Sequence, residues 1–331
     1  MQQTKFDVLG IGNAIVDILA TTTDAFLNEH GIAKGAMTLV DGFRAELLGR
    51  TMQGAVEASG GSAANTMVGI SSLGGNSAFI GKVNDDRLGK VFAEDIQKSG
   101  VHFDMKSAAG VVATASSHIL VSPDGQRSMN TFLGCASDLH DEDMSAVKIA
   151  AAKIMFIEGY LWDAPATKTA IRKAIKHAKI AGRKVALTLS DPFCVGRWRD
   201  EFLELLQSDV DVVFANEEEA KSLFQAGNFN DAFQALRSWG KTAAITRSAQ
   251  GSVIVENGAV HILEAEPVER VVDTTGAGDQ FAAGFLFGYA RDMSLDVCGR
   301  LGGMAAAEVI SHMGPRPHVS LKTLAGKAGL I

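Results

Sequence analysis

The sequence predicts an α/β protein with a mostly parallel sheet, helices on both faces of that sheet, and a smaller strand-rich part. From residue 153 onward, short apolar runs alternate with longer segments of helical periodicity, as expected for parallel strands joined by crossover helices. Before that, the sequence Ser-Pro-Asp-Gly at residues 122–125 separates two apolar runs and predicts a β-hairpin. The length of 331 residues suits one large α/β domain or two smaller ones.

Glycines mark most of the element ends in the first half of the chain. Gly12 follows the first apolar run, Gly74 follows the first long helical segment, and Gly100 follows the second. In order, the predicted elements are a strand at 6–11, an apolar run at 34–40, a helix at 62–73, a strand at 77–83, a helix at 87–98, and hairpin strands at 116–121 and 127–133. The run at 34–40 and the hairpin interrupt the alternation, so we expect them to form a small subdomain inserted in the core.

The second half alternates regularly and ends in a glycine-rich turn followed by two helices. Its predicted strands cover 153–157, 184–189, 211–214 and 242–246, with a two-strand piece at 252–263. Its predicted helices cover 166–180, 200–206, 217–224, 231–239, 277–290 and 295–312.

Composition and charge exclude several classes of function. The formal net charge is −7 and no Lys/Arg cluster stands out, which predicts no nucleic-acid partner, because such binding needs concentrated positive charge. Cys135, Cys194 and Cys298 are far apart and form no CxxC pair, which favours reduced thiols in a cytoplasm. No signal-peptide pattern is present, and no apolar run approaches the roughly 20 residues of a membrane span. We therefore expect a cytoplasmic protein without a membrane partner.

The most informative segment is Asp-Thr-Thr-Gly-Ala-Gly-Asp at residues 273–279. Glycines before a helical run predict a tight turn that opens a helix, and the free N–H groups and dipole at that end suit an anion such as phosphate. A carboxylate repels phosphate, so Asp279 needs a reason to be there. It could take a proton from a hydroxyl that attacks the phosphate. The alternative is that Asp279 only complements the helix dipole.

A second glycine-rich site precedes the first long helix. Gly60 and Gly61 would let the backbone approach a ligand closely, and Asn65 could offer a donor and an acceptor to vicinal hydroxyls. Alternatively, this is an ordinary helix start with Ser62 as the N-cap. Asp17 lies in an apolar strand, so it is either exposed at an edge or holds polar groups of a ligand, such as sugar hydroxyls.

Asn216 and Glu219 follow a predicted strand, and open α/β sheets bind ligands beyond the carboxyl ends of strands. The two residues can share a helix face, and their oxygens suit Mg²⁺ held through its waters. The alternative is an acid-rich helix N-terminus favoured by the dipole. Two nucleotide motifs fail: Ile15 replaces the third glycine of a dinucleotide fingerprint, and the residues from Gly75 to Gly81 miss the P-loop spacing.

Taken together, these segments resemble the ribokinase-like carbohydrate kinases of the phosphofructokinase-B type. The sites at residues 60–65, 216–219 and 273–279 occur in that family's order and at similar separations, and the resemblance covers essentially the whole chain. Within the family, the chain is most similar to the adenosine kinases, on Gly12-Asn13 with Asp17, residues 124–129 and residues 189–193.

The resemblance implies a ribokinase-like three-layer α/β/α core with a small β-strand lid. The core would comprise residues of about 1–13, 46–104 and 136–331, and the lid residues of about 14–45 and 105–135. It also implies a kinase that phosphorylates the 5′-hydroxyl of adenosine with ATP and Mg²⁺, and with K⁺ in many members. A monomer or homodimer is expected.

Each family position that this chain matches carries an implied role. Asp279 would be the catalytic base, with the backbone of Gly276, Ala277 and Gly278 as the anion hole. The residues implied to bind adenosine, through ribose contacts or an apolar slot for the purine, are Asn13, Ile15, Asp17, Leu39, Gly60, Gly61, Asn65, Met129, Leu161 and Phe193. The residues implied to contact ATP or its phosphates are Arg127, Asn216, Thr246 and Gly251. The residues implied at cations are Asn216 and Glu219 for Mg²⁺ and Asp273 for K⁺.

Three other functions stay open. The nearest is the same chemistry on a free sugar such as ribose or fructose. Apolar Leu39, Met129, Leu161 and Phe193 favour a flat base over a small polyol, although all four could be ordinary core residues. A non-catalytic nucleoside-binding protein is less consistent with an intact Asp279 and glycine turn. A dinucleotide-dependent dehydrogenase is disfavoured by the failed fingerprint.

Overall fold

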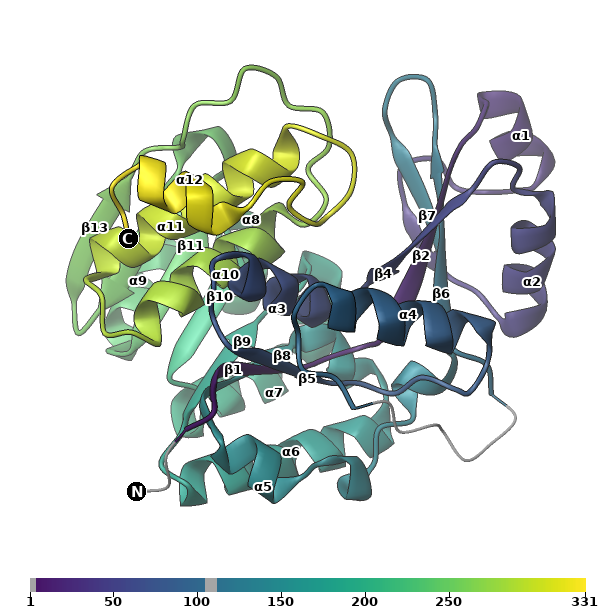
Figure 1. Ribbon diagram of the computed structural model, residues 1–331. Coiled ribbons are helices and arrows are strands. Elements are labelled where there is room, and N and C mark those ends of the chain that lie inside the picture. The colour runs from purple at the N-terminus through teal and green to yellow at the C-terminus, as the bar shows by residue number, and fades with distance from the viewer. Residues whose placement is uncertain (1–3, 105–111) are drawn as a thin grey trace.

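Two β-sheets organise the chain in the computed structural model, which describes residues 4–104 and 112–331 (Figure 1). The larger sheet has eight strands in the order β13-β12-β11-β10-β9-β8-β1-β5. These strands are β1 (Phe6–Ile11), β5 (Ser77–Ile80), β8 (Ala152–Glu158), β9 (Lys184–Thr188), β10 (Val212–Asn216), β11 (Thr242–Thr246), β12 (Ser252–Glu256) and β13 (Ala259–Leu263). All pairs from β5 to β11 are parallel, whereas β12 pairs antiparallel with β11 and β13. The predicted mostly parallel sheet is confirmed.

Helices cover both faces of the larger sheet, because successive side chains of a strand point to opposite faces. The face that includes Val8 and Phe156 packs against α3 (Ser62–Ser72), α10 (Ala277–Tyr289) and α11 (Leu295–Ile310). The face that includes Leu9 and Met155 packs against α6 (Pro165–Ile180), α7 (Pro192–Ser208), α8 (Glu217–Phe224) and α9 (Phe229–Trp239). The short helices α5 (Ala146–Ala150) and α12 (Leu321–Lys327) pack against α6 and α11. The three-layer α/β/α architecture is therefore confirmed.

The second sheet has five strands in the order β3-β7-β6-β2-β4 and stands beside the core (Figure 1). Its strands are β2 (Ile15–Thr21), β3 (Met37–Leu39), β4 (Val56–Gly60), β6 (Ala115–Val121) and β7 (Arg127–Phe132). The predicted hairpin is the antiparallel pair β6 and β7. Val16 and Ile18 face away from the core strands and pack with Leu27 of α1 (Asp24–Glu29), Leu48 of α2 (Gly42–Thr51) and the nearby helix α4 (Arg87–Lys98).

The boundary predicted between core and lid is wrong at residues 46–60. These residues were assigned to the core, but α2 extends to Thr51 and β4 pairs antiparallel with β2 in the small sheet. The strand has few strand-forming residues, Val-Glu-Ala-Ser-Gly, so its backbone pairing, which decides the boundary, has little local signal. Part of the predicted lid, residues 105–111, lies outside the described residues.

One core helix begins earlier than predicted. The expected helix at 200–206 is the second half of α7, which starts at Pro192 with Asp191 as its N-cap; the Asp191 side chain accepts from the backbone N of Cys194 at 2.7 Å. Proline at the first helical position and an acid before it are start signals. Only the second part of α7 was predicted, and Trp198, which lies between the two parts, has non-helical backbone angles.

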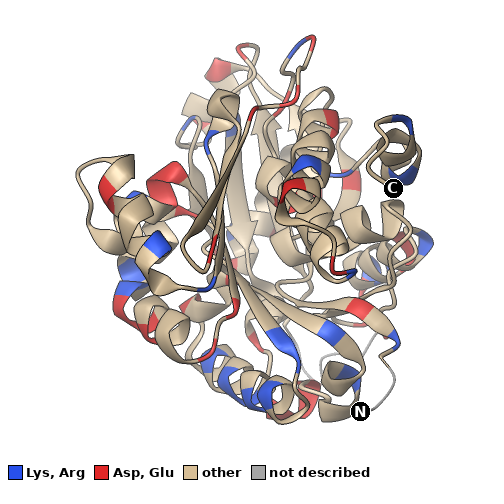
Figure 2. Cartoon of the chain, turned by 90° about the vertical axis from the view of Figure 1, so that its left-hand side faces the viewer, with Lys and Arg blue, Asp and Glu red and all other residues tan. Residues whose placement is uncertain are grey.

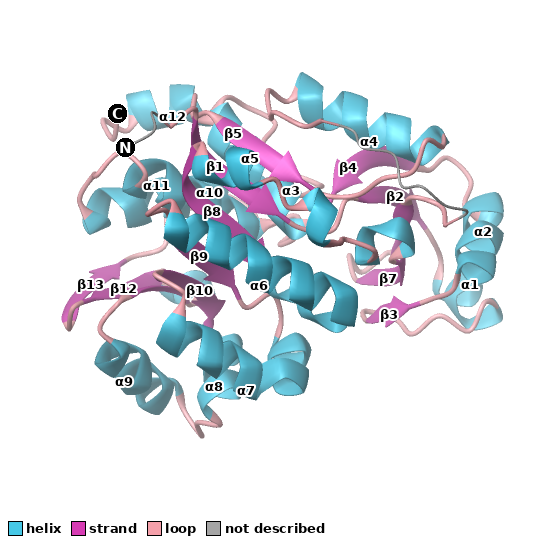
Figure 3. Ribbon diagram, turned by 90° about the horizontal axis from the view of Figure 1, so that it is seen from below, coloured by secondary structure: helices cyan, strands magenta, loops and turns pink. Residues whose placement is uncertain are grey.

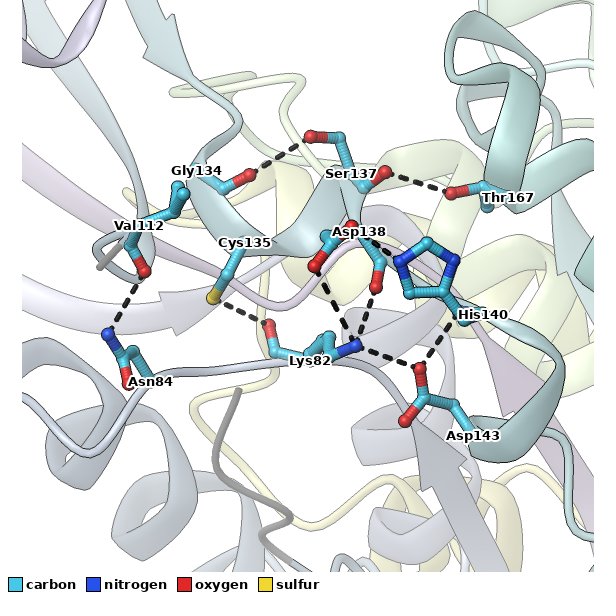
Figure 4. A network of polar contacts seen from close by, with 10 residues as sticks. All are labelled: Lys82, Asn84, Val112, Gly134, Cys135, Ser137, Asp138, His140, Asp143 and Thr167. Carbon is cyan, nitrogen blue, oxygen red and sulfur yellow. Dashed lines mark hydrogen bonds and ion pairs between the residues drawn. The ribbon is translucent and has the colours of Figure 1, made fainter. Parts of the chain in front are cut away.

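Lys82 anchors the segment that returns from the small sheet to the core (Figure 4). Its Nζ donates to the carbonyl of Asp138 at 2.7 Å and lies 3.1 Å from an Asp143 carboxylate oxygen. The same segment is held by Thr167, whose hydroxyl donates to the carbonyl of Ser137 at 3.1 Å. The Lys82 side chain is 10% exposed, and breaking a buried ion pair of this kind is costly. Lys82 is therefore engaged in structural contacts. This agrees with the sequence, in which the residues from Gly75 to Lys82 do not match a P-loop.

Basic and acidic residues are interspersed over the face drawn in Figure 2. On α6, Lys168, Arg172, Lys173 and Lys179 each form an ion pair with an acidic side chain, so their charges are locally compensated. Within residues 4–104 and 112–331, no helix has both the length and the apolar character needed to cross a membrane.

Candidate active site

The carboxyl ends of the parallel strands and the starts of two helices meet beside the small sheet. Figure 3 shows the arrow of β5 pointing toward the small sheet, and β1, β8, β9, β10 and β11 run parallel to it. Helices α3 and α10 pack against each other. Ligands of open α/β sheets bind at this kind of edge, so it is the candidate site.

Asp279, the third residue of α10, lies where α10 meets α3. Its Oδ1 accepts from Ser62 Oγ at 2.6 Å, and its Oδ2 accepts from Asn65 Nδ2 at 3.1 Å. Burial raises the pKa of Asp279, while the two hydrogen bonds and the charge of Arg316 oppose that rise. The alternative role of Ser62 as N-cap is wrong: the N-cap is Gly61, and no side chain caps α3. The Ser62 hydroxyl instead orients Asp279.

The turn before α10 leaves an open helix N-terminus. Gly276 is the N-cap with φ +78°, and a Cβ there would lie 2.6 Å from the carbonyl oxygen of Pro315, so only glycine fits. Ala277 N donates to the carbonyl of Thr274 at 3.2 Å, so this amide is engaged within the turn. A Cβ on Gly278 would have no neighbour within 4 Å among the described atoms. The amides at Gly278 and Asp279 belong to the first turn of α10, which no side chain caps, and such free N–H groups together with the helix dipole attract an anion.

Gly60 and Gly61 join the small sheet to α3 and bring its backbone against two polar residues. A Cβ on Gly60 would lie 2.3 Å from Asp17 Oδ2, and a Cβ on Gly61, which has φ +95°, would lie 2.3 Å from the carbonyl oxygen of Asn13. Only glycine fits at position 61, and a larger residue at position 60 would displace the Asp17 carboxylate. The structure thus brings Asn13, Asp17, Gly60 and Gly61 together beside Asn65.

Asp17 is a buried carboxylate in the middle of the small sheet. It is 9% exposed on β2, which lies between β4 and β6, so the alternative of an exposed edge acid is wrong. Burial raises the pKa of Asp17 to about 7, and the charge of Asp279 adds to the rise, while Arg316 and Arg127 oppose it. A buried acid surrounded by charges in a cleft is a common feature of functional sites.

The face of the small sheet that carries Asp17 is otherwise largely apolar. Cross-strand neighbours share a face, and the register places Asp17, Ser117, Thr131 and Leu39 in one row. The larger apolar side chains on this face include Ile15, Leu19, Met37, Leu39, Ile119 and Met129. Leu39 is 52% exposed. The structure therefore brings the predicted positions Ile15, Leu39 and Met129 onto one surface with Asp17.

Two residues predicted in the purine slot are not on this face of the small sheet. Leu161 is 1% exposed and packs in the core with Trp162 and Cys194, so the prediction of a ligand contact there is wrong. An apolar residue after a buried strand has the same sequence pattern whether it faces the core or a ligand. Phe193 is 81% exposed at the start of α7, and its ligand contact stays a prediction.

Arg127 connects the small sheet to the turn before α10. Its Nη1 donates to Thr275 Oγ1, and its Nη2 donates to the Asp273 carboxylate. Asp273 also accepts from the backbone N of Thr275 at 3.0 Å and of Gly314 at 2.8 Å. Because a guanidinium supplies the positive charge at Asp273, K⁺ does not fit beside this carboxylate. Arg127 lies next to the anion-binding turn, where a phosphate contact was predicted.

Asn216 and Glu219 form a capping box at the start of α8. Glu219 N donates to Asn216 Oδ1 at 2.8 Å, and both Glu219 carboxylate oxygens accept from Asn216. Glu219 is 5% exposed, and burial raises its pKa to about 7. Its oxygens are thus occupied within the helix cap, which does not fit direct coordination of Mg²⁺, and the predicted contact through the waters of Mg²⁺ stays a prediction. In the described residues, no three His, Cys, Asp or Glu side chains are grouped to hold a metal.

Thr246 is the last residue of β11, and Gly251 directly precedes the neighbouring strand β12. Thr246 ends β11 and pairs with Asn216 on β10, so both are at the carboxyl edge. Gly251 has φ +79°, and a Cβ there would lie 2.0 Å from the carbonyl oxygen of Leu263. This turn requires glycine for steric reasons, and the ATP contacts of Thr246 and Gly251 stay predictions.

Glu158 is a site residue that sequence reasoning missed. Its Oε1 accepts from Asn13 N at 2.9 Å and Asn13 Nδ2 at 2.8 Å, and its Oε2 accepts from Ala63 N at 2.9 Å. It is 1% exposed. Glu158 therefore holds Asn13 and the first turn of α3 in place. The available signal was an acid at the carboxyl end of a buried strand, where ligand sites form.

Glu158 is expected to make the protein less stable as pH rises, whereas an acid whose pKa is lowered on folding makes it less stable as pH falls. Burial raises its pKa from 4.5 to about 7, so the folded chain binds the proton more tightly than the unfolded chain. The contribution of Glu158 to stability is then full below pH 4.5 and is lost as pH rises through about 7. We expect Glu158→Gln to reduce the difference in unfolding free energy between acidic and alkaline pH in urea denaturation. Glu204→Gln, on exposed Glu204 of α7, is the control, and equal pH dependence in both variants would contradict the assignment.

Comparisons with known proteins give a consistent result for the whole chain. The model of the pfkB family carbohydrate kinases matches residues 38–322. The crystal structure of adenosine kinase from Sinorhizobium meliloti is 53% identical, with a TM-score of 0.92, over 98% of this chain and 100% of that chain. The structure of a probable sugar kinase protein from Rhizobium etli CFN 42 is 49% identical, with a TM-score of 0.93, over 99% and 100%. Adenosine kinase from Saccharomyces cerevisiae is 27% identical over 92% of this chain and 95% of its own length.

Proposed function

This chain belongs to the pfkB family of carbohydrate kinases, and we propose that it transfers the γ-phosphoryl group of ATP to the 5′-hydroxyl of adenosine. Such a kinase is a phosphotransferase with an alcohol acceptor. The observation that carries the proposal is Asp279 at the open N-terminus of α10, beside Gly278. A carboxylate next to an anion-binding turn is the pairing that phosphoryl transfer to a hydroxyl needs.

Asp279 accepts the proton of the 5′-hydroxyl while the hydroxyl oxygen forms a bond to the γ-phosphorus of ATP. The bond from that phosphorus to the β,γ-bridging oxygen breaks, and ADP leaves with the electron pair. The amides at Gly278 and Asp279 stabilise the charge on the transferring group, and one such preorganised donor contributes roughly 3–4 kcal/mol in other enzymes. Arg127, which reaches the same turn, adds positive charge there.

Asp17, with Asn13 and Gly61 nearby, is proposed to hold the ribose hydroxyls. Two observations support a nucleoside over a free sugar. Apolar side chains share the face of the small sheet with Asp17. A small polyol would leave exposed ones such as Leu39 and Met37 uncovered, whereas a purine buries apolar surface. The relative at 53% identity is an adenosine kinase.

ATP is proposed to bring Mg²⁺ with its phosphates, because Mg²⁺ keeps several waters and is commonly held by substrate phosphates. Within the described residues, Cys135, Cys194 and Cys298 are free and buried, which supports the expected reducing compartment, the cytoplasm. The product AMP would place the reaction in purine salvage.

The proposal is tested by measuring ADP formation from MgATP with adenosine, guanosine, cytidine, ribose and fructose as acceptors. We expect adenosine to give the highest kcat/KM. Turnover of ribose or fructose without turnover of adenosine would overturn the proposal in favour of a free-sugar kinase, the alternative that the 49% identical probable sugar kinase keeps open. Adenosine binding without turnover of any acceptor would favour a non-catalytic nucleoside-binding protein.

A further inference from the structure

Arg316 reaches the candidate site through Asn65. No motif in the sequence pointed to this arginine. Its Nε donates to Asn65 Oδ1 at 3.2 Å, and its Nη1 donates to Asp95 Oδ2 at 2.9 Å. The side chain is 15% exposed, and its Nη2 is buried without a hydrogen-bond partner in the described part of the chain. A buried guanidinium with an unsatisfied nitrogen is costly, so its position calls for a functional reason.

The contact with Arg316 determines which way the Asn65 amide points. An amide has one accepting and one donating end. Because Asn65 Oδ1 accepts from Arg316, Nδ2 is turned toward Asp279, to which it donates at 3.1 Å. Without the guanidinium, either end of the amide could face the carboxylate, and the oxygen end would repel it.

Arg316 also provides positive charge among several acids. Asp279 interacts electrostatically with Asp17 from β2, Glu158 from β8 and Glu219 from α8. Arg127 from β7 compensates Asp17, and Arg316 compensates both Asp17 and Asp279. Among the described groups that shift the pKa of Asp279, Arg316 is the one cation.

We propose that Arg316 is a positioning residue for the kinase reaction: through Asn65 it orients Asp279, and its charge favours the ionised carboxylate that accepts the hydroxyl proton. This inference rests on the proposed role of Asp279. Asp95 on α4 is the counter-ion of Arg316 and is itself held by Ser59, whose backbone N donates to it at 2.9 Å.

Substitutions of Arg316 and Asp95 have opposite expected effects. Arg316→Met removes the charge, so kcat should fall roughly tenfold or more at neutral pH, KM for adenosine should change less, and the acidic limb of the kcat/KM profile should move to higher pH. Arg316→Lys should restore part of kcat. Asp95→Asn leaves the Arg316 charge less compensated, so the acidic limb should move to lower pH. Damage to the fold would not shift the two profiles in opposite directions.

The matched control is Arg87→Met, because Arg87 likewise forms an ion pair with a carboxylate, that of Glu57 in the small sheet, but is exposed. Its pH profile should match that of the wild type. Titration of the Asp279 carboxyl by ¹³C NMR in the ligand-free protein repeats the test without turnover, with a higher pKa expected in Arg316→Met and a lower one in Asp95→Asn. Unshifted profiles and titrations in both variants would overturn the inference while leaving the proposed function intact. Absence of turnover in the wild type would instead contradict the proposed function, and the titration would still decide the role of Arg316.

Discussion

Asp279→Asn is expected to lower kcat by roughly a thousandfold, within the range of general-base contributions, while adenosine binding stays within a few-fold of the wild type. Asparagine has nearly the same shape but cannot accept the hydroxyl proton. The site can accommodate it, because the Ser62 hydroxyl, which donates to Asp279 at 2.6 Å, can also accept from an amide. Steady-state ADP formation gives kcat, and isothermal titration calorimetry gives the affinity for adenosine.

Asp231→Asn is the matched control for that substitution. Asp231 is also the third residue of its helix, α9, but its carboxylate accepts from Asn228 at 2.8 Å on an exposed surface. The control should keep full kcat. Near-normal turnover of Asp279→Asn would remove Asp279 from the role of base and would leave the dipole-complementing role that its sequence position also allows.

Gly278→Ala should have the second-largest effect, a loss of roughly a hundredfold in kcat/KM. A methyl group there meets no described atom within 4 Å, so the protein itself does not require glycine. Alanine also favours a helix more than glycine does. The melting temperature should therefore stay equal or rise while turnover falls, because the methyl group occupies the space where the phosphoryl group approaches the free amides.

Gly326→Ala provides the comparison for this loss. Gly326 lies in α12, and a Cβ there likewise has no described neighbour within 4 Å, but α12 contacts α3 at Ser72, the end of that helix opposite Ser62. The Gly326→Ala variant should keep both the melting temperature and the turnover of the wild type. If Gly278→Ala also kept full turnover, the space above the turn could not be the site of the transferring phosphoryl group.

Much of the site was predictable because its parts have local signals. In the glycine turn at residues 273–279, the N-cap Gly276 has a positive φ, a backbone conformation that only glycine adopts readily. A glycine directly before a helical run therefore indicates such a turn in the sequence. The capping box of Asn216 and Glu219 also follows from a three-residue spacing. The spacing of Asn216 and Glu219 is thus explained by the helix cap without a magnesium ion.

Other features depended on contacts that the sequence pattern does not encode. Leu161 was expected in the purine slot and lies in the core, since apolar residues facing a core or a ligand obey the same pattern. Glu158 holds Asn13 across 145 positions of the chain, and no local spacing connects such residues. The assignment of residues 46–60 to the core failed for the same reason, because β4 joins the small sheet through backbone bonds to β2.

The sequence by itself determined the fold class, the anion-binding turn and Asp279 as its acid, because helical and strand periodicity and the conformational freedom of glycine are properties of short segments. Only the tertiary structure decided what surrounds that acid. Asp279 meets Ser62 across 217 positions and Asn65 across 214, and Arg316 meets Asn65 across 251. Packing of α3 against α10 makes the contacts of Asp279 with Ser62 and Asn65, whereas Arg316 comes from the segment between α11 and α12. Burial between these elements raises the pKa of Asp279. The environment that would make this carboxylate a base is therefore a property of the folded chain.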